Sequence, residues 1–323
     1  MKEILYDEIP SLDLADFVGD DPEKKKKFVA ALGAAYNNIG FVAIKNHFLT
    51  NAMQEKLYAA IKKYFALPDD VKKEHERMDL AGQRGYTGKG KEHAKGRNTG
   101  DLKEFYHVGQ ELSAAELSRE GYPANIWPDQ VPELMEAAID VYHALEKTGT
   151  NILRAIALYL GLPERYFDDK IKNGNSILRP IHYFPIADPL AVPDDAVRAA
   201  EHGDINLITL LMGASADGLQ VLRRDGKWIP ITALPEQLVV NVGDMLERLT
   251  NKKLKSTIHR VVNPPRDVMN VPRYSIPFFM HPRSEMSLAA LDSCVDQSNP
   301  KQWTDITAGE FLDQRLREIG LKK

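Results

Sequence analysis

The fold class rests on residues 207–242, which read LITLLMGASADGLQVLRRDGKWIPITALPEQLVVNV. Four short apolar runs, at 207–212, 219–222, 228–231 and 238–242, alternate here with turn-forming Gly, Pro and Asp. Similar runs lie on either side of this stretch, at 177–184, 259–262 and 274–279. Short strands at roughly ten-residue spacing predict a β-sandwich, a barrel or a jelly roll. They exclude a parallel sheet, which needs a helix between each pair of strands.

Helical patterns dominate the sequence before residue 173. Apolar positions recur at helical spacing from residue 23 to a stop at Gly40, across 50–65 and across 128–160. We expect a buried strand at 41–44, a loop rich in Gly, Lys and Arg at 81–100, and an amphipathic helix at 307–319. Four regions are therefore expected: a helix-rich N-terminal region over 1–125, connecting helices over 126–172, a β core over 173–285 and a C-terminal helical segment over 286–323.

Composition excludes several classes of protein. The 323 residues carry a net charge of -4 with a pI near 6.2, whereas a nucleic-acid partner requires a basic face. The single cysteine, Cys294, excludes an intramolecular disulfide and a thiolate zinc site. No apolar run approaches the roughly 20 residues that span a bilayer, and the first residues lack the apolar segment of a signal peptide. We therefore expect a cytoplasmic globular protein with neither a nucleic-acid nor a membrane partner.

His202, Asp204 and His259 suggest a metal site. In extended backbone, residues i and i+2 project to the same face, so His202 and Asp204 can converge on one point. His259 begins another expected strand. Two neutral imidazoles and one carboxylate form the facial triad that holds Fe(II) and leaves adjacent coordination positions open. Zinc accepts the same ligand types and is the alternative metal.

Arg273 and Ser275 form a second polar element, on one face of the last expected strand. A guanidinium beside a hydroxyl can hold one carboxylate through charge-assisted hydrogen bonds. A surface ion pair is the other interpretation of Arg273. The apolar run at 276–279 disfavours it, because an arginine that enters a core needs an anionic partner.

These residues lie in stretches that resemble the iron(II)- and 2-oxoglutarate-dependent oxygenases of the isopenicillin N synthase-like family. The stretches are IPSLDL (9–14), GFVAIKNH (40–47), GLQVL (218–222), LVVNVGDM (238–245), STIHRV (256–261) and RYSIPFF (273–279), so the resemblance covers nearly the whole chain. It implies a double-stranded β-helix (jelly-roll) core, with His202, Asp204 and His259 as iron ligands. It also implies that Arg273 and Ser275 bind the distal carboxylate of 2-oxoglutarate. The family usually adds a polar residue from the first core strand, for which Tyr183 is favoured and His182 is the alternative.

The function that this resemblance implies is a dioxygenase reaction. The enzyme would use Fe(II), O2 and 2-oxoglutarate, form succinate and CO2, and oxidise a small molecule, with hydroxylation favoured. The sequence is compatible with two alternatives. One is an iron oxidase of the same fold that needs no 2-oxoglutarate, as in the ring closure of isopenicillin N synthase. The other is a metal- or ligand-binding β-helix protein without turnover.

The sequence also suggests which residues surround the substrate. Wall residues are expected at five positions: Tyr86, Lys103, Phe105, Gln220 and Phe279. Basic residues of the 81–100 loop favour a small polar or anionic substrate, which the loop could cover: Arg84, Lys89, Lys91, Lys95 and Arg97. Neither the identity of the substrate nor the oligomeric state follows from the sequence.

Overall fold

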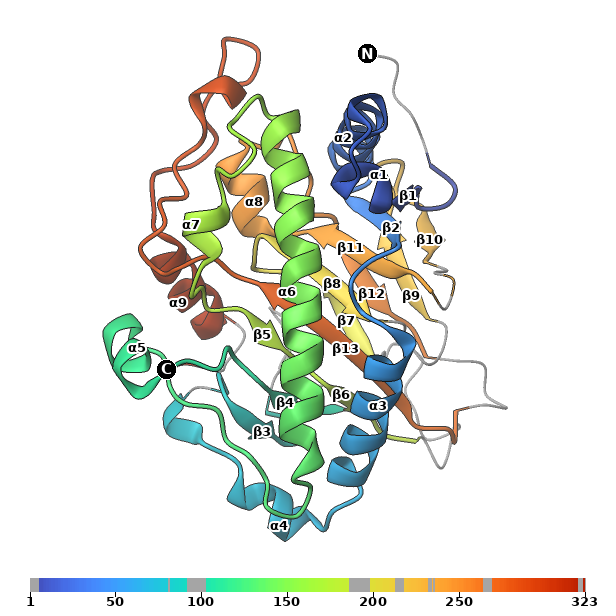
Figure 1. The fold of residues 1–323 in the computed structure, drawn as a ribbon, viewed down its shortest axis with the longest axis vertical. Coiled ribbons are helices and arrows are strands. Elements are labelled where there is room, and N and C mark those ends of the chain that lie inside the picture. The colour runs from blue at the N-terminus through green and yellow to red at the C-terminus, as the bar shows by residue number, and fades with distance from the viewer. Residues whose placement is uncertain are drawn as a thin grey trace.

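A large β-sheet is covered on one face by helices, as Figure 1 shows for the computed structural model of the chain. The structure describes residues 6–80, 82–91, 103–185, 198–212, 218–231, 234, 236–263, 269–318 and 322. The long helix α6 crosses the sheet, and α2 and α3 pack beside it. A smaller sheet lies on the other side of the large one. This two-sheet arrangement is the jelly roll expected from the short strands.

Strands and helices follow one another along the chain with the following bounds. The strands are β1 (Ser11–Asp13), β2 (Phe41–Lys45), β3 (Gly85–Thr87), β4 (Lys103–His107), β5 (Ile177–Leu178), β6 (Ile181–Tyr183), β7 (Ala199–His202), β8 (Ile208–Met212), β9 (Leu219–Leu222), β10 (Trp228–Pro230), β11 (Leu238–Val242), β12 (His259–Val261) and β13 (Arg273–Met280). The helices are α1 (Ala15–Val18), α2 (Pro22–Asn38), α3 (Asn51–Phe65), α4 (Asp69–Glu74), α5 (Ala114–Glu120), α6 (Glu133–Tyr159), α7 (Asp168–Ile171), α8 (Asp244–Leu249) and α9 (Ala308–Glu318), with short 3-10 turns at Met78–Leu80 and Asp292–Cys294.

The two sheets have simple strand orders. The nine-stranded sheet runs β1-β2-β11-β8-β13-β6-β4-β3, with β5 also paired to β13. The four-stranded sheet runs β10-β9-β12-β7. Only the β1–β2 pair is parallel among the strand pairs that the structure describes. The N-terminal region thus supplies β1 to β4 to the large sheet, in addition to its helices.

Close approach and capping fix the helix layer against the large sheet. The Asp21 carboxylate accepts hydrogen bonds from the backbone N–H groups of Glu23 and Lys24 and caps the start of α2. Gly149 lets α6 lie directly on the sheet, since a Cβ there would come within 2.5 Å of the Met280 sulfur. The main hydrophobic core fills the space between these helices and the large sheet.

A second apolar cluster joins the two sheets at one end. Its side chains come from β2 and β11 of the large sheet and from the strands of the small one. Phe41, Val239 and Val261 are buried members of this cluster. Members of this cluster, among them Phe41 and Val261, also line the cavity near the histidines of β7 and β12.

Most elements expected from the sequence are confirmed, but some differ from the expectation. Part of the expected 81–100 loop is strand β3, and the run at 177–184 is divided into β5 and β6 at Pro180. The strands β4 and β7 and the short helices α1, α5, α7 and α8 are not predicted by the sequence. Among the described residues, no helix combines the length and the apolar character needed to cross a membrane.

Candidate metal centre and the adjoining cavity

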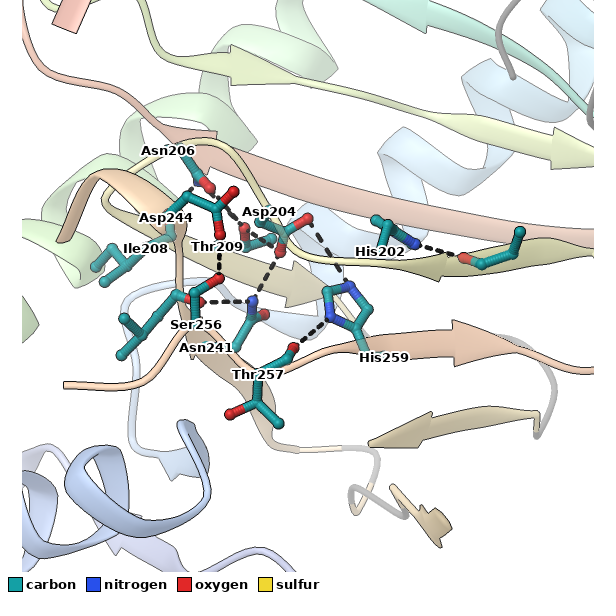
Figure 2. Close-up of polar contacts among 12 residues, drawn as sticks. His202, Asp204, Asn206, Ile208, Thr209, Asn241, Asp244, Ser256, Thr257 and His259 are labelled. Atoms are coloured by element: carbon teal, nitrogen blue, oxygen red, sulfur yellow. Dashed lines mark hydrogen bonds and ion pairs between the residues drawn. The ribbon is translucent and has the colours of Figure 1, made fainter. Parts of the chain in front are cut away.

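His202, Asp204 and His259 converge at the edge of the small sheet (Figure 2). His202 ends β7, His259 begins β12, and the two residues are direct cross-strand partners with ring centroids 4.4 Å apart. Asp204 follows His202 by two residues. One donor atom from each of the three side chains lies within 4.8 Å of the others. The antiparallel pairing of β7 with β12 therefore brings together residues that are far apart in the sequence.

Backbone carbonyls determine which nitrogen each histidine presents. The Nδ1 atom of His202 lies 2.7 Å from the carbonyl oxygen of Ala200, and the Nδ1 atom of His259 lies 3.1 Å from that of Thr257. A carbonyl oxygen only accepts hydrogen bonds, so Nδ1 carries the proton in both rings. Each Nε2 atom is then left with its lone pair. Histidines that bind a metal usually have this arrangement, in which one ring nitrogen donates to a backbone carbonyl and the other is left to bind the metal.

The carboxylate of Asp204 is oriented in the same way. Its Oδ2 atom accepts hydrogen bonds from Thr209 Oγ1 and Asn241 Nδ2, each at 2.7 Å. Its Oδ1 atom lies 3.8 Å from Nε2 of His259 (Figure 2). One oxygen is thus occupied by protein donors, and the other faces the histidines.

Electrostatics keep the site in the protonation state that a metal requires. Burial and the neighbouring His259 ring lower the pKa of His202 to about 4, so this imidazole is neutral at pH 7. Burial alone would raise the pKa of Asp204, but the two imidazoles and the hydrogen bonds from Asn241 and Thr209 outweigh it and lower that pKa. A carboxylate oxygen and two imidazole nitrogens form the donor set of non-haem Fe(II), so the residues present fit this metal.

Arg273, Ser275 and Tyr183 lie together in the adjoining cavity. Arg273 and Ser275 share one face of β13, and both are buried. Tyr183 of β6 is the direct cross-strand partner of Arg273, whose guanidinium lies 5.0 Å from the centre of the tyrosine ring. His182, the alternative to Tyr183, points to the opposite face of the sheet, where it stacks on Tyr274 at 4.9 Å. The structure thus places Tyr183, and not His182, beside the arginine.

The cavity has a volume of about 630 Å³ and contains both groups of residues. Its lining includes His202, Asp204 and His259 together with Arg273, Ser275 and Tyr183. Lys103 and Phe279, two of the five expected wall residues, also line it. The two groups of residues therefore face one cavity.

The other three expected wall residues are described by the structure but do not line the cavity. Tyr86 is buried and donates its hydroxyl to Glu104. Phe105 is covered, because the Arg179 guanidinium lies 4.4 Å from the centre of its ring. Gln220 lies between the inward-facing residues of β9 and accepts a hydrogen bond from Arg260. The expectation that these three residues form the cavity wall is therefore wrong.

The expected basic loop is also different from the prediction. Arg84 is fully buried against Gly109 and is not a surface cation. Lys91 forms an ion pair with Glu76 at 3.2 Å, and Lys89 lies over the ring of Phe184. Lys95 and Arg97 lie outside the described residues.

Several cavity residues were not predicted from the sequence. Gln83, His107, Arg179 and His281 line the same space, and α9 contributes Leu312 and Leu316. A signal for His281 exists, because it continues the alternation of residues 273, 275, 277 and 279 along β13. No sequence pattern indicates that the C-terminal helix reaches the cavity.

Fold and donor set together define a non-haem metal enzyme built on a jelly roll. The comparisons with known proteins carry this further. Residues 9–130 match the family described as the N-terminal region of a non-haem dioxygenase in morphine synthesis. Residues 175–282 match the 2OG-Fe(II) oxygenase superfamily. The chain belongs to the 2OG-Fe(II) oxygenase superfamily.

Individual relatives match this chain over almost their whole length. The proline hydroxylase buaE of Petromyces alliaceus is 32% identical, with 96% of this chain and 98% of that protein covered. A Caulobacter crescentus protein assigned to the 2OG-Fe(II) oxygenase family is 43% identical, with a TM-score of 0.85 and coverage of 96% and 99%. A full-length Neurospora crassa protein, solved in complex with alpha-KG and thymine, is 30% identical, with a TM-score of 0.85 and 96% of each chain covered. The protein is accordingly an Fe(II)- and 2-oxoglutarate-dependent dioxygenase that oxidises a small molecule and uses O2 as co-substrate.

Proposed function

We propose that His202, Asp204 and His259 hold the catalytic Fe(II), and that Arg273, Ser275 and Tyr183 hold the distal carboxylate of 2-oxoglutarate. The observation that carries the metal assignment is the orientation of the donors. Both Nδ1 atoms and one carboxylate oxygen are hydrogen-bonded to protein, so two Nε2 atoms and Asp204 Oδ1 remain for a metal. Zinc has the same ligand preferences, but the oxygenase family of the chain favours iron.

The residues around this centre divide the chemical task. When bound, Fe(II) and 2-oxoglutarate would activate O2, and 2-oxoglutarate would be converted to succinate and CO2. Arg273 offers a buried, permanently charged guanidinium, and Ser275 adds a hydroxyl on the same strand face. Asn241 and Thr209 keep the Asp204 carboxylate in one orientation. The residues of the cavity wall would limit the access of water to the reacting groups.

Hydroxylation of a small metabolite is the proposed reaction, in the cytoplasm. The cavity volume of about 630 Å³ has to hold both 2-oxoglutarate and the substrate, which favours a compact molecule over a polymer. The relative named proline hydroxylase and the Neurospora crassa protein with thymine bound support a small cyclic substrate. The division into regions 1–125, 126–172, 173–285 and 286–323 also remains a proposal.

Binding measurements test the two sets of residues separately. Under anaerobic conditions, His259→Ala is expected to abolish tight Fe(II) binding, whereas Arg273→Ala is expected to leave it intact and to weaken 2-oxoglutarate binding at least about 10-fold. Arg154, which pairs with Asp168 on the helical side, supplies the control variant Arg154→Ala. Unchanged 2-oxoglutarate affinity in Arg273→Ala would remove the fork from the proposal. Unchanged iron affinity in His259→Ala would remove the triad.

A further inference from the structure

A second arginine faces the cavity at a distance from the proposed 2-oxoglutarate fork. Arg179 lies between β5 and β6, and its backbone N–H bonds to the carbonyl of Pro277 on β13 at 2.9 Å. Arg273 begins the same strand, four residues before Pro277. At roughly 3.3 Å per residue, the two arginines are attached about 13 Å apart along the strand. A 2-oxoglutarate carboxylate held by Arg273 would therefore not also be held by Arg179.

His107 holds Arg179 in a defined orientation. The Nδ1 atom of His107 lies against the carbonyl oxygen of Gly82, so Nδ1 carries the proton and the ring is a neutral acceptor at Nε2. Nε2 accepts the hydrogen bond that Arg179 donates from Nε. A histidine in this state orients the guanidinium without neutralising its charge.

Two aromatic rings complete the setting of Arg179. Its guanidinium lies 4.4 Å from the ring centre of Phe105 and 5.1 Å from that of Phe279. Phe105 and His107 are alternate residues of β4, and their rings lie 4.8 Å apart. Cation–π contacts and the imidazole hydrogen bond together limit the motion of a long side chain, which reduces the entropy lost when a ligand binds.

The position of Arg179 also relates it to the metal site. Phe279 pairs across strands with Thr209, whose hydroxyl bonds to the Asp204 carboxylate. Phe279, Arg179 and Ile177 line one part of the cavity, on the side of β13 that carries β5 and β6. An apolar body placed on Phe279 and Ile177 would lie next to the triad while a polar group reaches Arg179.

We propose that Arg179, oriented by His107 between Phe105 and Phe279, recognises the prime substrate through an acceptor oxygen. The substrate class is a small molecule with an apolar or flat body and a carboxylate or ring-carbonyl oxygen. This inference rests on the proposed function, because it takes Arg273 as the 2-oxoglutarate anchor. Arg179 then determines specificity, and the reaction at the metal does not require it.

Equilibrium binding to the Fe(II)- and 2-oxoglutarate-loaded protein, without O2, tests the inference. Two acids, L-proline and benzoate, and two neutral cyclic amides, thymine and uracil, serve as probes. At least one probe is expected to bind, and Arg179→Met is expected to weaken it at least about 10-fold. Arg179→Lys should retain part of the affinity. Binding that falls with added salt identifies the carboxylate source, and salt-independent binding identifies the carbonyl source.

A matched control comes from Arg248, whose guanidinium also lies between two aromatic rings, Trp303 and Phe311, outside the cavity lining. Arg248→Met should leave probe binding unchanged. Arg179→Met should keep wild-type affinity for 2-oxoglutarate, which separates this inference from the proposed function. Equal probe affinity in wild type and Arg179→Met would overturn it, as would binding of none of the four probes by a protein that binds 2-oxoglutarate. Loss of 2-oxoglutarate binding in Arg179→Met would overturn it too, by reassigning the arginine to the co-substrate.

Discussion

Replacing Glu104 by Gln is expected to destabilise the protein at the paired strands β4 and β6, which line part of the cavity. Glu104 is a buried residue of β4, on the face of the strand that points away from the cavity. Its carboxylate accepts hydrogen bonds from Lys72 Nζ at 2.8 Å and Tyr86 Oη at 2.6 Å, and lies 2.7 Å from Nδ1 of His182. Glu104 and His182 are also cross-strand partners. This cluster therefore ties α4 and β3 to the two strands that carry Lys103 and Tyr183.

The expected magnitude follows from the charge that the substitution leaves behind. The Lys72 side chain is only 4% exposed, so an ammonium without its buried counter-charge is costly. Removing one partner of a buried pair costs about 3–5 kcal/mol. Lys72 keeps a second partner, the exposed Asp69 carboxylate at 3.0 Å, which favours the lower end, about 3 kcal/mol. That is a large part of a total stability of about 5–15 kcal/mol.

Urea unfolding followed by tryptophan fluorescence and far-UV circular dichroism measures this change. The control is Asp305→Asn, which removes an exposed ion pair with Lys301 and should cost less than about 1 kcal/mol. The double variant Lys72→Met/Glu104→Gln should recover much of the loss, because neither charge is then buried alone. A loss in Glu104→Gln no larger than that in Asp305→Asn would refute the reasoning.

A second check is the pH dependence of the difference in unfolding free energy between wild type and Glu104→Gln. Burial raises the pKa of Glu104, but the hydrogen bonds from His182, Lys72 and Tyr86 outweigh it and hold the pKa below its ordinary value. The contribution of Glu104 is therefore present above its pKa in the unfolded chain and is lost as the pH falls through its lower pKa in the folded protein. The stability gap between wild type and Glu104→Gln should narrow in acid. A gap that widens in acid would contradict this sign.

Three further predictions concern the metal centre and its surroundings. Asn241→Leu removes a donor to Asp204 and should weaken Fe(II) binding by about 10–100-fold, measured by anaerobic titration, with wild-type affinity as the contradicting result. Gly243→Ala would place a Cβ 2.1 Å from the carbonyl oxygen of Asn206, so it should lower the free energy of unfolding by about 1–3 kcal/mol and also lower the affinity for iron. An unchanged free energy of unfolding, measured in urea, would contradict this prediction. Burial lowers the pKa of His281 to about 4, so metal-free protein should lose stability as the pH falls from about 6.5 towards 4, because the unfolded chain takes up the proton first. His281→Gln should flatten that decline, and an equally steep decline in urea midpoints would count against it.

The jelly-roll core was predictable because its strands are apolar and separated by turn residues. β8, β9, β10 and β11 coincide with the four runs of residues 207–242. β4 escaped prediction for a physical reason: its five residues are all buried, yet Lys103, Glu104 and His107 are polar. Polar residues that satisfy one another inside the protein have the pattern of a surface segment, and the partners of Glu104 come from distant parts of the chain.

The candidate site shows the same division between local and long-range information. His202 and Asp204 are two residues apart, so their convergence follows from strand geometry alone. The residues that form the wall of the cavity depend on which strands pair and in which register. Local sequence patterns do not reveal this pairing. Gln220 is an instructive exception, because its apolar neighbours Leu219 and Val221 already place it on the outer face by strand alternation.

The most direct test of the central claim is a parallel measurement of O2 consumed and succinate formed by the Fe(II)-reconstituted protein with 2-oxoglutarate. The proposed site predicts that succinate forms in equal amount to the O2 consumed, that Zn(II) does not replace Fe(II), and that His259→Ala abolishes both signals. Consumption of O2 without succinate would contradict the role of Arg273, Ser275 and Tyr183. Undiminished succinate formation by His259→Ala would contradict the metal centre itself.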